Sequence, residues 1–314
     1  MALDDDPLDT LIDTELRRTA PHAIGSLAEQ LAQRGGKRTA AVLFYGSALR
    51  TNTVEGVLDF YVLLDDVGAW PAARIATVGN RVLPPNVGYV EANIAGETLR
   101  AKYAVMSLRQ FHARMSPGSI DTTVWARFCQ PSICIWARAE ADRRAVAAAV
   151  RDAAITASKW AVWLGPDTGD ATDYWRALFA QTYGAELRVE SAQRGDDIVT
   201  RDAARYSMLL PAAWRHAGIE YRTQSDGRLT PRVDAAERRQ AARRWRHRQR
   251  LGKPLNLARL LKASFTFEGA MDYVAWKVER HSGVHVEVKP WQRRFPLLAA
   301  PGLYWRLRKR GVLR

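Results

Sequence analysis

Apolar and polar positions follow different patterns in the two halves of the chain. In the first half, short apolar runs are separated by turn residues, as expected of strands in a sheet. These predicted strands cover 40–44, 58–66, 87–94, 98–106 and 133–136. The second half has apolar residues at helical spacing over 145–161, 174–183, 198–210 and, in an arginine-rich form, 234–250. Two earlier helices are expected at 8–33 and 69–79.

This order of elements predicts an α/β (α+β) fold, in which a mixed sheet with flanking helices precedes a helical region. We expect boundaries near Glu140 and Thr223, which divide the chain into 1–139, 140–222 and 223–314. A chain of 314 residues is long enough for two domains, or for one large domain with an appendage.

Positive charge is concentrated in the last third of the chain. The whole sequence has a net charge of +14. Residues 222–262 contain 13 basic and 3 acidic side chains, and 289–314 contain 8 basic and no acidic ones, whereas 1–221 have a net charge of −2. The first two thirds therefore have the charge of an ordinary enzyme, and the last third predicts an anionic partner.

Segment 289–314 interleaves its basic residues with aromatic and apolar ones. This composition favours a helix that lies in the interface of an anionic membrane, and a nucleic acid or a partner protein are the alternatives. The residues expected to bind the membrane are Trp291, Arg293, Arg294, Phe295, Tyr304, Trp305, Arg306, Arg308, Lys309 and Arg310.

Several features predict a cytoplasmic protein. Residues 1–9 contain four aspartates and no basic residue, which is the reverse of a targeting segment, so we expect no signal peptide. No apolar run approaches the 18 or so residues that a membrane-spanning helix needs. The two cysteines, Cys129 and Cys134, form neither a disulfide framework nor a metal set.

The strongest chemical signal is a Gly-Ser pair, Gly46-Ser47, between the first two predicted strands. Glycine lets backbone N–H groups approach a triphosphate, and Asp59 on the next strand can hold the metal that bridges the phosphates. This arrangement resembles the polymerase-β-like nucleotidyltransferases. Taken alone, Gly46-Ser47 favours an ordinary strand-to-helix turn in which serine caps the helix, and only together with the acid-bearing strand are the two interpretations equally supported.

The second strand has only one acid in the tight motif, because Tyr61 occupies the position where the superfamily has another. Alternation places Asp59 and Asp65 on the same face of a strand, but about 20 Å apart at ~3.3 Å per residue. One Mg²⁺ therefore cannot bind both while the strand stays regular.

Further segments resemble one family, the mitochondrial-type phosphatidate cytidylyltransferases (CDP-diacylglycerol synthases of the translocator assembly and maintenance family). The resemblance covers roughly residues 20–215. Its motifs are Tyr45-Gly46-Ser47, Asp59-Phe60, Leu64-Asp65-Asp66 with Trp70, Lys102-Tyr103-Ala104-Val105-Met106-Ser107, Trp125-Ala126-Arg127-Phe128-Cys129-Gln130-Pro131 and Gln181-Thr182-Tyr183-Gly184-Ala185-Glu186-Leu187-Arg188. The chain departs from the family at Pro71, Arg74, Glu91 and Ala104, which affects the expected metal ligands and pyrimidine contacts.

The resemblance implies a nucleotidyltransferase domain over 1–139 and a helical domain of winged-helix type over 140–222. The membrane-associating region over 223–314 lies beyond the resemblance and is predicted from its basic and aromatic composition. The resemblance also implies transfer of the cytidylyl group from CTP to phosphatidic acid, with Mg²⁺ as cofactor, at the cytoplasmic face of the cell membrane. Asp59 and Lys102 would be catalytic, Gly46, Ser47, Lys102 and Arg127 would bind the nucleotide, and Asp59 with Asp65, Asp66 or Glu91 would hold the metal. Because the implied substrate is a lipid, no nucleic-acid partner is expected.

Two other functions fit the same sequence. An RNA-directed nucleotidyltransferase would use the basic last third to bind RNA. A degenerate nucleotidyltransferase fold, suggested by Tyr61 in place of the second acid, would act as an adaptor at a membrane or nucleic acid.

Overall fold

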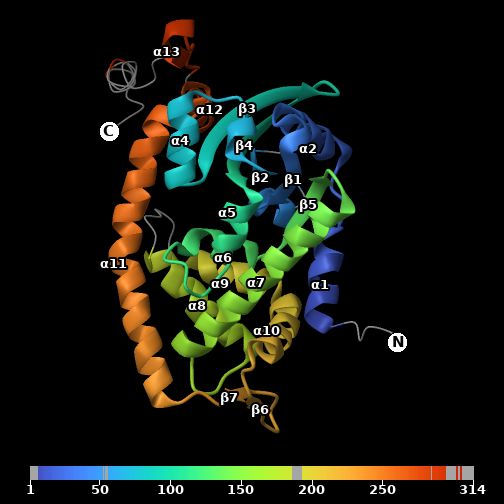
Figure 1. Ribbon diagram of the computed structural model, residues 1–314, viewed down its shortest axis with the longest axis vertical. Coiled ribbons are helices and arrows are strands. Elements are labelled where there is room, and N and C mark those ends of the chain that lie inside the picture. Colours follow the sequence, from blue (N-terminus) through green and yellow to red (C-terminus); the bar gives the residue numbers. More distant parts are fainter. Residues whose placement is uncertain are drawn as a thin grey trace. The chain divides into compact units, whose positions relative to one another are not determined.

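The computed structural model describes residues 6–51, 53, 56–185, 193–283, 285–294, 302 and 305 (Figure 1). Its main strands form a mixed five-stranded sheet in the order β3-β4-β2-β1-β5, which confirms the predicted mixed α/β class. The strands are β1 (Thr39–Tyr45), β2 (Val57–Leu64), β3 (Asn86–Ile94), β4 (Glu97–Ser107) and β5 (Ser132–Ala137). A separate pair consists of β6 (Tyr221–Thr223) and β7 (Leu229–Pro231).

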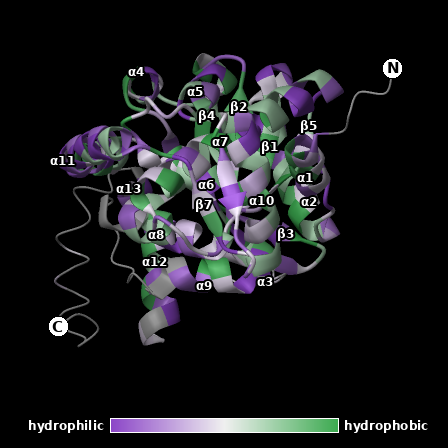
Figure 2. Cartoon of the chain, turned by 90° about the horizontal axis from the view of Figure 1, so that it is seen from below, coloured by the Kyte–Doolittle hydropathy of each residue, from purple (hydrophilic) through white to green (hydrophobic). Residues whose placement is uncertain are grey.

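Helices make up most of the remaining described chain. They are α1 (Pro7–Leu16), α2 (His22–Arg34), α3 (Ser47–Thr51), α4 (Arg74–Val82), α5 (Leu108–Ala113), α6 (Thr122–Phe128), α7 (Glu140–Leu164), α8 (Ala171–Ala185), α9 (Gln193–Arg201), α10 (Ala203–Ala217), α11 (Ala235–Thr266), α12 (Ala270–Ser282) and α13 (Pro290–Arg294). None of those described has the length and apolar content that crossing a bilayer requires. Figure 2 shows that hydrophilic residues predominate along α11.

The chain divides into two compact units that interleave in sequence. The helical unit contains 1–19 and 108–258, and the sheet unit contains 20–107 and 259–314. The end of the chain thus belongs to the same unit as β1 to β4, a relationship that the sequence pattern does not reveal. The three-part division predicted from the sequence stays a prediction.

In the sheet unit, β2 pairs with β1 in antiparallel and with β4 in parallel orientation, and β3 and β4 form the predicted hairpin. The residues of β2 alternate between two faces, as in any strand. One face carries Phe60, whose ring lies 5.3 Å from that of Phe44 on β1. On the same face, Tyr103 of β4 contacts Trp70, and Arg34 at the end of α2 stacks over both rings. This face forms the buried core of the unit.

Two predicted helices begin or break at proline. The helix expected over 8–33 is interrupted, because α1 ends at Leu16 and α2 begins after Pro21. The helix expected from residue 69 begins only at Arg74, after Pro71. Proline cannot donate a helical hydrogen bond and disfavours the α conformation of the residue before it, so both corrections have the same cause.

In the helical unit, α7 packs against α8 and α10 (Figure 1). Each of these helices carries a fully buried tryptophan: Trp160, Trp175 and Trp214. A buried ion pair joins α1 to α10: Arg205 binds both carboxylate oxygens of Glu15 and also donates to the carbonyl of Cys129, 3.1 Å away. Removing one partner of such a buried pair leaves an uncompensated charge, which typically costs about 3–5 kcal/mol. The pair therefore fixes α1 onto the unit.

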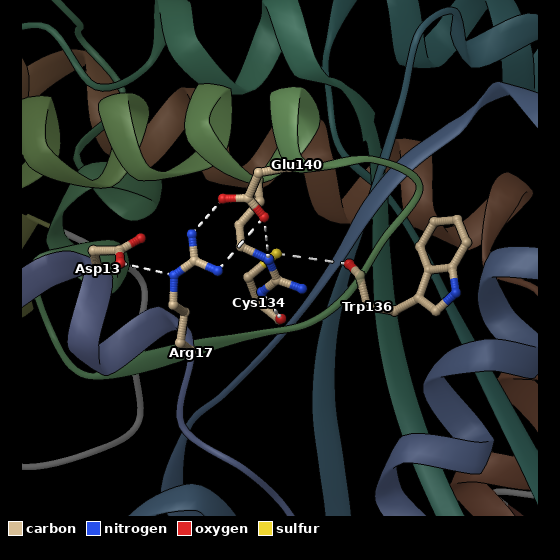
Figure 3. Close-up of polar contacts among 6 residues, drawn as sticks. Asp13, Arg17, Cys134, Trp136 and Glu140 are labelled. Atoms are coloured by element: carbon tan, nitrogen blue, oxygen red, sulfur yellow. Dashed lines mark hydrogen bonds and ion pairs between the residues drawn. The ribbon is translucent and has the colours of Figure 1, made fainter.

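A second polar cluster joins α1 to the start of α7 (Figure 3). Arg17 donates to Asp13, 2.7 Å away, and to Glu140, whose pKa the Arg17 hydrogen bond lowers. Beside it, Arg143 donates to the carbonyl of Cys134 over 2.7 Å. The Cys134 thiol itself is buried and donates to the carbonyl oxygen of Trp136 over 3.6 Å.

Candidate functional site

Four residues form a row across the sheet unit. Tyr45 of β1 stands opposite Asp59 of β2, Asp59 stands opposite Lys102 of β4, and Lys102 stands opposite Tyr89 of β3. Residues directly opposite each other in a sheet point to the same face, and adjacent strands are about 4.8 Å apart. The structure thus brings together two of the predicted site residues, Asp59 and Lys102. They lie on the face of the sheet opposite the one that carries Phe60.

The Gly-Ser turn adjoins this row. Strand β1 ends at Tyr45, Gly46 has a φ of +96°, and α3 begins at Ser47, whose side chain is exposed. A Cβ atom on Gly46 would lie only 2.9 Å from Oδ2 of Asp59. Glycine is required here for two reasons, because an L side chain disfavours this φ and because the Asp59 carboxylate occupies the space. The turn and the acid are therefore one structural feature.

Aromatic residues surround the carboxylate. Tyr61 is 2% exposed and its ring meets that of Tyr45 edge-on, with centroids 5.5 Å apart. Burial raises the pKa of Tyr273 on α12, and the negative charge of Asp59 raises it further. The Asp59 charge thus acts on a helix more than 200 positions later in the sequence. Tyr61 is therefore buried against Tyr45 on the same face of β2 as Asp59.

Helix α12 carries residues of this face that the sequence analysis missed. The ring of Tyr273 lies 5.3 Å from that of Tyr89, and Trp276 lies under the guanidinium groups of Arg100 and Arg280. The sequence pattern that could have identified them is the helical spacing of Tyr273, Trp276 and Arg280, which puts two aromatic rings and a cation on one side of a helix. This pattern lies outside the segment that resembles the cytidylyltransferases, between the two basic regions.

A cavity of about 880 Å³ adjoins the same strands within the sheet unit. Its lining includes Tyr89, Arg100, Asp272 and Trp276. The volume lies within the range of about 300–1,000 Å³ that small-molecule sites occupy. The lining carries five acids, Glu91, Glu268, Asp272, Glu279 and Glu287, and two arginines, each paired with one of those acids, so its charge does not favour an anionic ligand.

Glu91, a predicted metal ligand, contacts Tyr89 and Arg100. Tyr89 donates to Oε1 of Glu91 over 2.6 Å, and Nε of Arg100 lies 3.3 Å from the same oxygen. Glu91 stands opposite Arg100, whereas Asp59 stands opposite Lys102, so Glu91 is two strands and two positions removed from Asp59. Glu91 is therefore a charge partner of Arg100.

Asp65 and Asp66 lie beyond the other end of β2. The strand is regular from Val57 to Leu64, so both acids are separated from Asp59 by nearly its whole length. Asp66 caps the short 3-10 helix Val67–Ala69 by accepting from the N–H of Gly68 over 2.6 Å, and this bond lowers its pKa. The structure does not bring either acid to Asp59.

Arg127 belongs to the helical unit, where it lies on α6 with partial exposure between the fully buried Trp125 and Phe128. Its role toward a nucleotide stays a prediction.

The predicted membrane-binding segment is described only in part. Trp291 and Trp305 are 50% and 62% exposed, and Arg293 pairs with Asp272 over 2.9 Å. Arg294 ends α13. The remaining predicted residues lie outside the described part of the chain: Phe295, Tyr304, Arg306, Arg308, Lys309 and Arg310.

A scan against models of known protein families finds none that matches this chain, and a search of curated proteins finds no relative. The resemblance to the cytidylyltransferases therefore rests on the motifs quoted above. Nor do the described residues contain a group of three or more His, Cys, Asp or Glu side chains close enough to hold a metal ion.

Proposed function

We propose that this protein is a phosphatidate cytidylyltransferase, which converts CTP and phosphatidate into CDP-diacylglycerol and pyrophosphate. The observation that carries the proposal is the contact between the Gly46 turn and Asp59, because nucleotidyl transfer needs a phosphate-accepting turn beside a metal-binding acid. In this proposal the sheet unit is the nucleotidyltransferase domain. The helical region is of winged-helix type, as the family resemblance implies.

Mg²⁺ fits the donors that the site offers. Protein sites often hold this ion through one or two carboxylates, and the substrate phosphates and water complete its coordination. Asp59 is the carboxylate at the turn, so a nucleotide-dependent metal site is consistent with the absence of a three-ligand group among the described residues. When bound, Mg²⁺ would neutralise charge on the triphosphate.

The remaining residues of the row have roles in binding and orientation. Lys102, opposite Asp59, is positioned to offset phosphate charge, and the backbone of Gly46-Ser47 can approach the phosphates closely. Phosphatidate carries a phosphomonoester that is largely dianionic near pH 7, because its second pKa is about 6. Such a nucleophile needs no general base, so alignment and charge neutralisation are the main requirements.

A lipid substrate requires access to a membrane. We therefore propose peripheral association with the cytoplasmic face of the cell membrane, to which the basic segment 289–314 contributes.

The proposal is tested by incubating purified protein and Mg²⁺ with phosphatidate vesicles and each of the four labelled ribonucleoside triphosphates. We expect a lipid product labelled from CTP, at least about tenfold faster than from ATP or GTP, with UTP as the closest competitor. A parallel reaction with RNA in place of phosphatidate tests the principal alternative. Equal use of ATP, or label transferred to RNA alone, would contradict the proposal.

A further inference from the structure

Helix α4 and the end of α11, both in the sheet unit, expose large apolar side chains in helical stripes. On α4, Ile75, Val78 and Val82 are 68%, 57% and 79% exposed. Their spacing of three and four residues places them on one side of the helix. Near the end of α11, the corresponding residues are Leu260, Leu261 and Phe265, with exposures of 59%, 63% and 65%. We call these six residues the α4–α11 surface.

The two stripes are fixed beside each other by Lys262. Its ammonium donates to the carbonyl oxygens of Leu83 and Pro85, both 2.6 Å away, just after α4. Its stem passes α4 so closely that a Cβ atom on Gly79 would lie 3.3 Å from Cδ of Lys262. On α4, Gly79 lies between the exposed stripe and the buried face of Ala76 and Asn80. The α4–α11 surface is therefore held by specific contacts of the chain itself.

The charge around this surface is positive. Helix α4 contains Arg74 and Arg81 and no acid, and the part of α11 in the sheet unit, from Arg259 to Thr266, contains two basic residues and no acid. Arg74 and Arg81 are exposed beside the apolar stripe, although Arg81 is partly offset by Asp66, 3.3 Å away. Exposed apolar side chains with a basic surround are the composition of a surface that inserts into an anionic bilayer.

We propose that the α4–α11 surface binds anionic lipid bilayers, with its apolar residues inserted among the lipids and the neighbouring arginines at the headgroups. Soluble monomers rarely leave this much apolar side chain exposed in one place, so the surface needs an occupant. A second copy of the chain would place the arginines of two copies close together, which is unfavourable. The choice of a lipid partner also rests on the proposed function, because a phosphatidate-using enzyme meets its substrate in a bilayer.

The most direct test places a polarity-sensitive, thiol-reactive fluorophore on a Val78→Cys variant. The two native thiols do not compete, since Cys129 and Cys134 are buried and burial raises their pKa values to about 12 and about 11. Met208→Cys on α10 is the matched control, because Met208 is also an exposed apolar residue, at 58%, but lies in the helical unit. Vesicles of phosphatidate and phosphatidylcholine should shift the emission of the label at position 78 to the blue and leave that at position 208 unchanged.

A second test measures flotation with the same vesicles. The Val78→Asp, Leu261→Asp double variant should lower the bound-to-free ratio by about tenfold or more, because charged side chains cannot insert, whereas Met208→Asp should leave it unchanged. Circular dichroism and thermal unfolding confirm that each variant is folded. Neutral phosphatidylcholine vesicles should bind the wild type more weakly than the anionic ones.

Three results would overturn the proposal. One is unchanged flotation of the folded double variant, and another is an unshifted label at position 78 on protein that does float. The third is a concentration-dependent blue shift without vesicles together with a dimer by light scattering, which would assign the surface to a second copy. Activity on water-soluble, short-chain phosphatidate separates this proposal from the proposed function. The double variant should keep this activity, because the substrate does not require membrane binding. A wild type that floats with vesicles but never transfers CMP would contradict only the enzymatic proposal.

Discussion

Asp59 and Lys102 stand directly opposite each other in the parallel pairing of β2 with β4. The carboxylate lies at the Gly46 turn, and the lysine is the next residue of the row toward Tyr89. A substrate phosphate that reached this row would meet a carboxylate and a cation on neighbouring strands. The pair is the centre of the proposed site.

The register predicts that the two side chains are energetically coupled. Asp59→Asn and Lys102→Met should show a coupling free energy of about 0.5–3 kcal/mol in a double-mutant cycle of unfolding free energies, as expected for residues in contact. Asp65→Asn lies beyond the far end of β2, so its effect should add to that of Lys102→Met within about 0.5 kcal/mol. Additivity in both cycles would mean that Asp59 and Lys102 act independently.

Gly46→Ala should impair function beyond its cost in stability. The substitution strains a φ of +96° and pushes the new methyl group against the Asp59 carboxylate. The control is Gly96→Ala in the β3–β4 turn, where φ is +87° and no atom lies within 4 Å of the added Cβ. Both should lose about 1–2 kcal/mol of stability, but only Gly46→Ala should lose cytidylyl transfer, by about tenfold or more. Equal activities would show that the contact is unimportant.

Glu268 holds the chain before α12 against the sheet. Its carboxylate accepts from Arg34 over 2.6 Å and from the hydroxyl of Tyr103 over 2.8 Å, and its carbonyl accepts from the N–H of Tyr89. Glu268→Ala should lower the free energy of unfolding by about 1–3 kcal/mol, because the buried hydroxyl of Tyr103 and the partly buried guanidinium of Arg34 lose their acceptor. Glu29→Ala, at an exposed position of α2, should change it by less than about 0.5 kcal/mol. Denaturant unfolding of both variants measures the difference.

The two thiols predict a loss of stability at alkaline pH. Burial raises the pKa of Cys129 to about 12 and that of Cys134 to about 11, whereas a thiol in an unfolded chain has a pKa of about 8.5. The unfolded state therefore releases protons first as pH rises. The stabilising contribution is complete below about pH 8.5 and is lost toward pH 11–12. A Cys129→Ala, Cys134→Ala variant should show a smaller alkaline loss than the wild type, and an identical pH profile would contradict this assignment.

The local pattern of the chain predicted much of the sheet unit. Strands β1 to β4 and the Gly46 turn follow from apolar runs and turn residues that are close in sequence. The proximity of Asp59 to Gly46 needed only one hairpin-like pairing, so spacing along the chain was sufficient to suggest it. The break before α2 was missed because helical periodicity on both sides concealed the effect of Pro21.

What could not be predicted depends on contacts between distant segments. Tyr273 and Glu268 both contact Tyr89 of β3, Tyr273 through its ring and Glu268 through its backbone carbonyl. The spacing of apolar residues along the chain does not predict contacts of this kind. Two predicted ligands bind other groups nearby: Asp66 accepts a hydrogen bond from the N–H of Gly68, and Glu91 pairs with Arg100. A carboxylate binds the donors that its surroundings provide. Sequence identified which residues could do the chemistry, whereas the strand register decided which of them lie together.

The most direct test of the central claim is the rate of CDP-diacylglycerol formation by wild-type protein and by Asp59→Asn. The assay contains Mg²⁺, labelled CTP and short-chain phosphatidate, so membrane binding does not limit it. We predict that the wild type forms the labelled product and that the folded variant is slower by about 100-fold or more, since charge neutralisation on the triphosphate is the main catalytic contribution. A variant that keeps more than about a tenth of the wild-type rate, a barrier change of only ~1.4 kcal/mol, or a wild type that makes no product, would contradict it.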